Sequence, residues 1–351
     1  MQLIKLSLKN FRNHALKELL FNKGITLIVG SNAIGKTNIL ESIFLLATGK
    51  SFRAEVESEM IQTGQELSRV IGEIKTADDQ VKLEIILTPG LISGIRSARK
   101  RYLVNGVARR MVDFVGKLRV VYFGPEDLEI IVDGPSIRRN YLDSVLVQTD
   151  REYRRALLSY RKGLRQRNKL LEQIRDEGKS RSVLFFWDKL LVENGGTLTY
   201  KRQEFINFIN NGSWGFGELF VEYDNSAISP QRLQQYEREE VASATTLVGP
   251  HRDDFCVNLV EDEQKRDLHG YGSRGEQRTA IFGLKLAELA YIKEVTGEKP
   301  VLLLDDIFSE LDHQRRKKLL EVIPHQQTII TTSDIHLVEP EFRDKIEIIK
   351  F

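Results

Sequence analysis

Residues 30–37, GSNAIGKT, have the spacing of glycine, lysine and hydroxyl residues that forms a phosphate-binding loop, G-x-x-x-x-G-K-[ST]. A short β-rich run ends at this segment, and a helical pattern begins directly after it. Glycines let backbone N–H groups surround a phosphate, and the N-terminus of a helix adds positive potential. We therefore predict a nucleotide site in which Lys36 binds the phosphates and Thr37 binds Mg²⁺. The predicted nucleotide-binding residues of this loop are Gly30, Ser31, Asn32, Ala33, Ile34, Gly35, Lys36, Thr37 and Asn38.

Residues 301–306, VLLLDD, form a continuous apolar run that ends in two carboxylates. Such a run is typical of a buried central strand whose C-terminal end faces a ligand. Following a phosphate loop, Asp305 is expected to bind Mg²⁺ through water, and Asp306 to orient or deprotonate the attacking water. The predicted catalytic residues are therefore Lys36, Asp305 and Asp306, with ATP and Mg²⁺ as cofactors. A core strand that merely runs into an acidic turn is the alternative.

A second glycine-rich segment, residues 270–279 (GYGSRGEQRT), precedes a long apolar helical run. Ser273 and Glu276 have the S-x-x-E spacing of a helix capping box, which is the favoured interpretation of the segment in isolation. The segment also lies 32 residues before Asp305 and between two nucleotide-binding motifs. That position favours a second phosphate contact, so both interpretations stay open.

Residues 150–182 have the pattern of a basic, coiled-coil-like helix. Lys and Arg number eleven over residues 151–182, against four Asp and Glu. The apolar residues recur at spacings of three and four, namely Tyr153, Leu157, Tyr160, Leu164, Leu171 and Ile174. A second helical stretch follows a polar break, so we expect an arm of antiparallel helices. The basic face is either only solvated or contacts DNA phosphates through Arg151, Arg154, Arg155, Arg161, Lys162, Arg165 and Arg167.

The composition sets broad limits on the chain. Its 351 residues predict two lobes, and its 52 basic and 50 acidic side chains mean that any contact with DNA is local. The lone cysteine excludes an internal disulfide and, with no apolar run long enough to span a membrane, predicts a cytoplasmic protein. Asn105 and Gly106 predict a hairpin turn inside the arginine-rich stretch 96–110, which is an exposed hairpin or a second DNA contact.

Together these motifs resemble ABC-type ATPase heads and, more closely, the RecF family of bacterial DNA-repair proteins. The matching segments extend from residue 8 to residue 312: LKNFRN, GSNAIGKTN, GKSFR, PEDL, RRNYLD, LRQRN, VGPHRDD, SRGEQR and LLLDDIFSELD. The resemblance implies an α/β fold, an ABC-type P-loop ATPase head with a mixed β-sheet that is interrupted by a helical, coiled-coil-like arm domain. We expect the head to comprise residues 1–118 and 241–351, and the arm residues 119–240.

The resemblance also implies a mechanism. ATP would hold two copies of the chain together, with residues 309–312 crossing the interface and the signature loop completing the nucleotide site at Lys36 of the partner subunit. The residues implied for that contact are Ser273, Arg274, Gly275, Glu276 and Gln277. The dimer would clamp DNA, either duplex or single-strand/duplex junctions, without sequence preference. Its expected role is recombinational repair and replication, with RecR-type and RecO-type mediators as partners.

The sequence also departs from the pattern of ABC-type heads. Asp306 replaces the usual catalytic glutamate, which predicts slow hydrolysis that serves as a release switch. No Q-loop glutamine occurs in VVYFGPEDLEII, and Thr332 or Ser333 replaces the usual switch histidine. Residues 251–254 (HRDD) match a family motif, for which a structural turn or a metal site are the open interpretations. The rival function, a nucleotide-binding subunit of a membrane transporter, is disfavoured because Lys36 and Asp305 are 269 positions apart.

Overall fold

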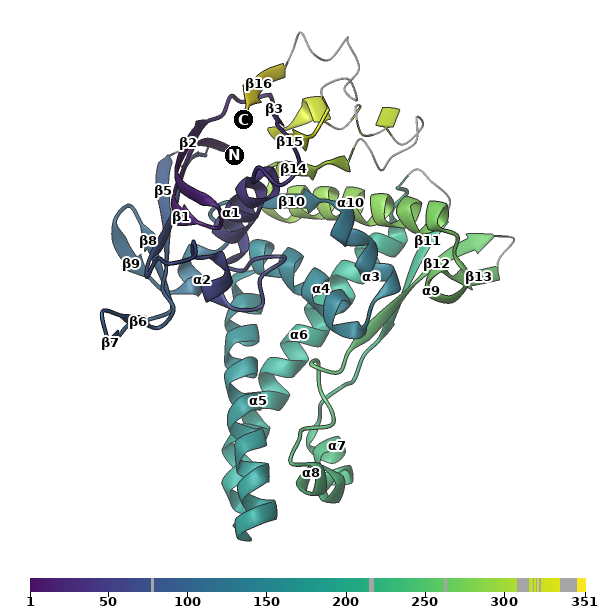
Figure 1. Cartoon of the computed structure of the whole chain (residues 1–351). Helices are drawn as coiled ribbons and strands as arrows, with labels where there is room; N and C mark the ends of the chain where they lie inside the picture. Colours follow the sequence, from purple (N-terminus) through teal and green to yellow (C-terminus); the bar gives the residue numbers. More distant parts are fainter. Residues whose placement is uncertain are drawn as a thin grey trace. The chain divides into compact units, whose positions relative to one another are not determined.

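The structure, a computed structural model, describes residues 1–76, 79–214, 218–261, 264–307, 316, 317, 319, 321, 323–334 and 346–351 (Figure 1). The chain divides into two compact units. Unit 1 contains Met1–Asp127 and Glu288–Phe351, and unit 2 contains Leu128–Ala287. The predicted head and arm boundaries, after residues 118 and 240, stay predictions. The compact units described here have their boundaries after residues 127 and 287.

An antiparallel sheet of six strands lies in unit 1. Its order is β2 (His14–Leu20), β1 (Gln2–Phe11), β4 (Ser68–Lys75), β5 (Gln80–Leu87), β8 (Lys100–Val104) and β9 (Val107–Arg109). Buried and accessible residues alternate along β4, as expected for a strand with one face on the core. Asn105 and Gly106 connect β8 to β9 with φ angles of 51° and 79°, which confirms the predicted hairpin turn. A short hairpin, β6 (Leu91–Ile92) and β7 (Ile95–Arg96), precedes β8.

A second sheet of unit 1 is wholly parallel. Its order is β10 (Val120–Phe123), β14 (Val301–Asp305), β15 (Thr328–Thr332), β3 (Ile25–Val29) and β16 (Ile346–Lys350). Every residue of β10, β14 and β15 is buried, as in a central parallel sheet. Helix α1 (Lys36–Thr48) follows β3 after the predicted phosphate loop. Parallel order places the C-terminal ends of β3, β14 and β15 at one edge, where the predicted site residues occur.

Unit 1 also contains the end of α10 (Arg274–Thr296) and, among the residues that the structure describes, several short elements. The short elements are η1 (Glu57–Met60), α2 (Met111–Phe114), η2 (Pro125–Leu128) and η4 (Ile323–His325). Residue Leu128 of η2 is already the first residue of unit 2.

Unit 2 is mostly helical. Its helices are α3 (Glu129–Val132), α4 (Pro135–Thr149), α5 (Arg151–Glu177), η3 (Arg181–Leu184), α6 (Phe185–Asn211), α7 (Pro230–Gln235), α8 (Glu237–Ser243), α9 (Leu268–Tyr271) and the start of α10 (Arg274–Thr296). Three antiparallel strands accompany them, β11 (Glu218–Asp224), β12 (Asp254–Glu261) and β13 (Gln264–Asp267).

Helices α5 and α6 form an antiparallel pair, drawn side by side in Figure 1. The Asp150 side chain caps the start of α5, which ends at Gly178 with a φ of 67°. Tyr153 near the start of α5 contacts Arg202 near the end of α6, whereas Arg167 further along α5 contacts Asp188 near the start of α6. The predicted pair of antiparallel helices is thus confirmed.

Candidate nucleotide site and nucleic-acid interface

The predicted phosphate loop connects β3 to α1 and leaves the N-terminus of α1 without a side-chain cap. Gly35 stands at the N-cap position with a φ of 107°, a conformation that only glycine adopts readily. The Lys36 ammonium donates to the carbonyl oxygens of Gly30 at 2.7 Å and of Ser31 at 3.0 Å. The loop therefore presents a lysine and the unsatisfied N–H groups of a helix start, the two features that bind a phosphate.

The remaining loop residues differ in exposure. Residues 31–34 are exposed, and Thr37 and Asn38 are half-buried in the first turn of α1. Ala33 has a φ of 66°, in the left-handed region that disfavours a side chain. Ala33 therefore holds a strained backbone conformation at a loop position that glycine would occupy without strain.

Arg12, Asn13 and His14, at the end of the LKNFRN segment and directly after it, contact the phosphate loop and α1, a role that the sequence did not predict. The Asn13 amide donates to the Ile34 carbonyl, and Nε2 of His14 lies 3.1 Å from the Gly35 carbonyl oxygen. Burial lowers the pKa of His14, so the neutral ring donates from Nε2. Arg12 binds both oxygens of the buried Glu41 carboxylate on α1, at 2.6 and 2.9 Å.

Asp305 lies at the end of β14 and is buried, with 4% of its surface exposed. Its Oδ1 accepts from the Thr331 hydroxyl at 2.5 Å, and its Oδ2 lies 3.2 Å from the Tyr122 hydroxyl. Burial and the carboxylates of Asp305 and Glu126 raise the pKa of Tyr122 well above its usual value. Asp306 follows with a left-handed φ of 48°, and its N–H donates to the Thr331 carbonyl.

Two other predicted positions follow the same sheet edge. The Thr332 hydroxyl is buried and donates to the carbonyl of Asp334, whereas Ser333 is exposed. Residues 309–312, which we expected to cross a dimer interface, lie outside the described residues.

The second glycine-rich segment forms the capping box that the sequence predicted. The Glu276 N–H donates to the Ser273 hydroxyl at 3.3 Å, and the Ser273 N–H donates to the Glu276 carboxylate at 2.7 Å. Arg266 binds the same carboxylate, and these bonds lower the pKa of Glu276 to about 2. Ser273, Arg274 and Gly275 are exposed at the start of α10. Gln277 is instead buried, and its amide donates to the Leu268 carbonyl.

The basic side chains of α5 fall into two groups. Arg151, Arg155, Lys162 and Arg165 are exposed, and Lys169 continues this face at the same spacing of three and four. Arg154 and Arg161 are half-buried and bind the Val147 carbonyl and the Asp143 carboxylate.

The assignment of Arg167 to the DNA-contacting residues is wrong, because this side chain is fully buried. It donates to Asp188 at 2.7 Å, to Glu240 at 2.7 Å and to the Thr246 hydroxyl at 2.9 Å. Arg167 occupies a core position of the helix pair, where α6, α8 and the loop after α8 supply its partners.

The HRDD motif is a structural centre of unit 2 in which Asp253 is buried, His251 and Asp254 are half-buried and Arg252 is exposed. Nε2 of His251 lies 2.9 Å from the Thr246 carbonyl oxygen and Nδ1 lies 2.7 Å from the Tyr160 hydroxyl, so both ring nitrogens have partners. Burial lowers the pKa of His251 to about 4. Asp253 accepts from Arg202 at 2.8 Å, and Asp254 binds Arg138 through both oxygens. These contacts support the structural turn, and the described part of the chain contains no group of three potential metal ligands.

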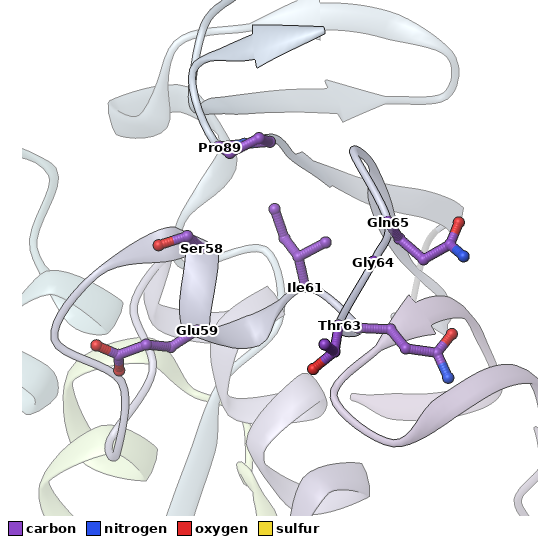
Figure 2. A pocket seen from close by; sticks show the side chains of 8 residues that line it. Ser58, Glu59, Ile61, Thr63, Gly64, Gln65 and Pro89 are labelled. Carbon is purple, nitrogen blue, oxygen red and sulfur yellow. The ribbon is translucent and has the colours of Figure 1, made fainter. Parts of the chain in front are cut away.

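A shallow polar depression is a separate feature of unit 1. Figure 2 shows the Ile61 side chain at its centre, with Ser58 and Glu59 on one side and Thr63, Gly64 and Gln65 on the other. Only one ionisable side chain lines it, so we assign it no chemistry. Among the described helices, none is both long and apolar enough to cross a membrane.

Comparison with known proteins places this geometry in a family. The model of the RecF/RecN/SMC N terminal domain matches residues 2–346. A DNA replication and repair protein RecF from Halalkalibacterium halodurans is 37% identical over 358 residues, covering 95% of this chain and 93% of the relative. A solved structure of the recombination mediator protein RecF-ATP in the RecFOR pathway has a TM-score of 0.86 at 36% identity, covering 96% of this chain and 93% of that one.

A more distant structure shares the fold alone. It is an Smc head bound to the C-winged helix domain of ScpA, with a TM-score of 0.50 at 19% identity, covering 96% of this chain and 91% of that one. The matches confirm the predicted ATPase-head fold and give no support to the transporter alternative. The phosphate loop between β3 and α1 and the carboxylate at the end of β14 agree with relatives that span nearly the whole chain. The chain therefore belongs to the RecF family of DNA replication and repair proteins.

Proposed function

We propose that the chain is an ATP-dependent DNA-binding protein of recombinational repair and replication. The observation that carries the proposal is the loop between β3 and α1, where Lys36 begins a helix that has no side-chain cap and its ammonium contacts the loop carbonyls of Gly30 and Ser31. The solved RecF-ATP relative, which matches across both units in sequence, supports ATP as the nucleotide.

The residues at the sheet edge fit a Mg²⁺–ATP complex. The hydroxyl of Thr37 and the carboxylate of Asp305 are hard oxygen donors, the type that Mg²⁺ prefers. When bound, Mg²⁺ would neutralise charge on the β- and γ-phosphates. Lys36 would bind the phosphate oxygens, and Asp306 would orient the attacking water. Because the Asp306 side chain is shorter than the usual glutamate, we expect hydrolysis to be slow and to serve release rather than turnover.

The exposed start of α10 is the proposed contact with a second copy of the chain. The Ser273 hydroxyl and the N–H groups at this helix start are suitable donors to a phosphate held by the partner subunit's Lys36. Arg274 and Gly275 complete the exposed surface. Glu276 and Gln277 would act indirectly, since the first caps the helix and the second binds Leu268. Binding of ATP by both copies would favour the dimer by linkage.

The exposed basic face of α5 is the proposed DNA contact. Its Arg155, Lys162 and Arg165 side chains recur on one face of the helix, as expected for contacts with a phosphate backbone. Such contacts carry no sequence information, which suits binding to duplexes and to single-strand/duplex junctions. The likeness to a mediator of the RecFOR pathway supports RecO-type and RecR-type partners.

The experiment that tests the proposal measures particle size with ATP, with ADP and without nucleotide, each with and without DNA. We expect a dimer and retention on DNA only with ATP. Ser273→Arg should bind ATP normally and remain monomeric, because its bulk and charge occupy the proposed interface. A wild-type chain that stays monomeric with ATP, or a variant that dimerises equally well, contradicts the shared site.

A further inference from the structure

A buried tyrosine that the proposed mechanism does not use lies against Asp305. Tyr122 is near the end of β10, which pairs in parallel with β14, and 4% of its surface is exposed. Its hydroxyl oxygen is 3.2 Å from Oδ2 of Asp305 and 2.8 Å from Oε2 of Glu126. With the Thr331 hydroxyl on Oδ1, hydroxyl groups from two neighbouring strands contact the two oxygens of the Asp305 carboxylate.

The position of this hydroxyl is tightly constrained. The Tyr122 ring stacks on Phe52, with centroids 4.0 Å apart and an interplanar angle of 21°, and Phe44 contacts it edge-on. A Cβ atom at Gly124 would lie only 2.2 Å from the hydroxyl oxygen, so residue 124 leaves room for it. A phenylalanine ring would fill the same space, so ring packing does not require a hydroxyl at this position. The polar contacts of the hydroxyl are therefore a separate feature of Tyr122 that packing does not explain.

The Tyr122 hydroxyl has two carboxylate acceptors but only one proton. A tyrosine donates a single hydrogen bond, so Glu126 and Asp305 compete for it. Glu126 has a second partner, since Nε of Arg53 lies 4.0 Å from its other oxygen. Glu126 belongs to η2, whose Asp127 accepts from the Gly124 N–H at 2.9 Å. A change at Asp305 can thus alter the hydrogen bonds of this turn.

We propose that Tyr122 is a positioning residue for Asp305, and that its hydroxyl, shared with Glu126, links the Mg²⁺–ATP site to the η2 turn. The inference rests on the proposed function, because Asp305 needs a precise orientation only when it serves the metal. Partners that orient a metal-binding group in this way commonly change metal affinity by about 10-fold to 100-fold when they are removed.

The test compares ATP affinity of the full chain in Mg²⁺ with its affinity in EDTA. For Tyr122→Phe we expect the ratio of the two affinities to fall by about tenfold, with the affinity in EDTA unchanged. Tyr102→Phe is the matched control in unit 1, because this half-buried tyrosine has a hydroxyl that contacts only the Gly49 carbonyl, at 3.4 Å, among the described bonds. Its ratio should equal that of the wild type. An unchanged ratio for Tyr122→Phe, or an equal loss for Tyr102→Phe, overturns the proposal.

A second variant keeps the test decisive if Tyr122→Phe folds poorly. In Glu126→Gln the competing carboxylate is removed, so the hydroxyl proton has Asp305 as its charged acceptor and the ratio should rise roughly threefold. The same change in the Tyr122→Phe background should have no effect. An unchanged or lowered ratio for Glu126→Gln contradicts the inference. A wild-type chain that binds ATP in neither condition would instead refute the proposed function itself.

Discussion

Replacing Arg167 by alanine should destabilise unit 2 while leaving the exposed DNA-contacting face of α5 intact. The guanidinium binds Glu240, which is fully buried, and Asp188, whose side chain is 31% exposed. Water can solvate Asp188 once the arginine is gone, so its loss counts for little. The Glu240 carboxylate would remain buried without its cation, and removal of one partner from a buried ion pair costs about 3–5 kcal/mol.

The measurement is urea unfolding followed by circular dichroism, together with DNA affinity at several salt concentrations. For Arg167→Ala we expect the free energy of unfolding to fall by about 3–5 kcal/mol. Under conditions in which Arg167→Ala is folded, the slope of its DNA affinity against salt concentration should equal that of the wild type. Arg167→Met combined with Glu240→Gln should recover more than half of the loss, because no buried charge remains.

Arg165→Ala is the matched control, since this exposed arginine lies two residues away on the same helix. Its stability should remain within about 0.5 kcal/mol of the wild type, because exposed substitutions rarely do more. Its DNA affinity should fall, and the salt slope should decrease by about one. If Arg167→Ala unfolds like the wild type yet loses a DNA contact, the assignment of Arg167 to the core is wrong.

Three further predictions follow from local geometry. Gly35→Ala should destabilise unit 1 by about 2 kcal/mol or more and weaken ATP binding, since its Cβ would lie 2.5 Å from the Asn13 side chain. The control is Gly64→Ala, which also has a positive φ but open space around it, and urea unfolding should show a smaller loss of stability for this variant. His251 has its pKa lowered to about 4, so the unfolded chain binds this proton more readily. Its contribution, about 3 kcal/mol, should be complete above pH ~6.5 and lost as the pH falls toward 4, and unfolding midpoints of His251→Gln should show a weaker pH dependence. Ser273→Ala should lower the stability by about 1 kcal/mol, because it removes the hydroxyl that caps α10. A decrease in the thermal unfolding temperature that appears only with ATP would contradict this prediction.

Local motifs could be predicted from the sequence because their geometry depends on neighbouring residues. The turn at Asn105 and Gly106, and the capping bonds between Ser273 and Glu276, each span four residues or fewer. The fold class likewise followed from motifs whose order is that of the family. The phosphate loop was recognisable because glycine, lysine and threonine must stand at fixed offsets around it.

Partners distant in the sequence escaped prediction. Arg167 looked like a surface residue because an arginine pattern carries no sign of the carboxylate of Glu240, 73 residues away. The contact of Tyr122 with Asp305 depends on β10 and β14 being neighbours, and the chain between them comprises more than 170 residues. The family motif at residues 251–254 gave no role either, because its partners come from α4, α5, α6 and β11.

The strand order of the parallel sheet sets the sequence of events during synthesis. β3 pairs with β15 on one edge and with β16 on the other, so Ile25 gains its partners Thr328 and Ile346 only after those residues have been synthesised. Residues 128–287 are contiguous and have their own core, so unit 2 can fold while unit 1 is still incomplete. The phosphate loop is therefore among the first segments made and among the last to acquire its neighbours. We expect a chain that ends before residue 346 to fold unit 2 but to leave the β3 edge that pairs with β16 uncovered.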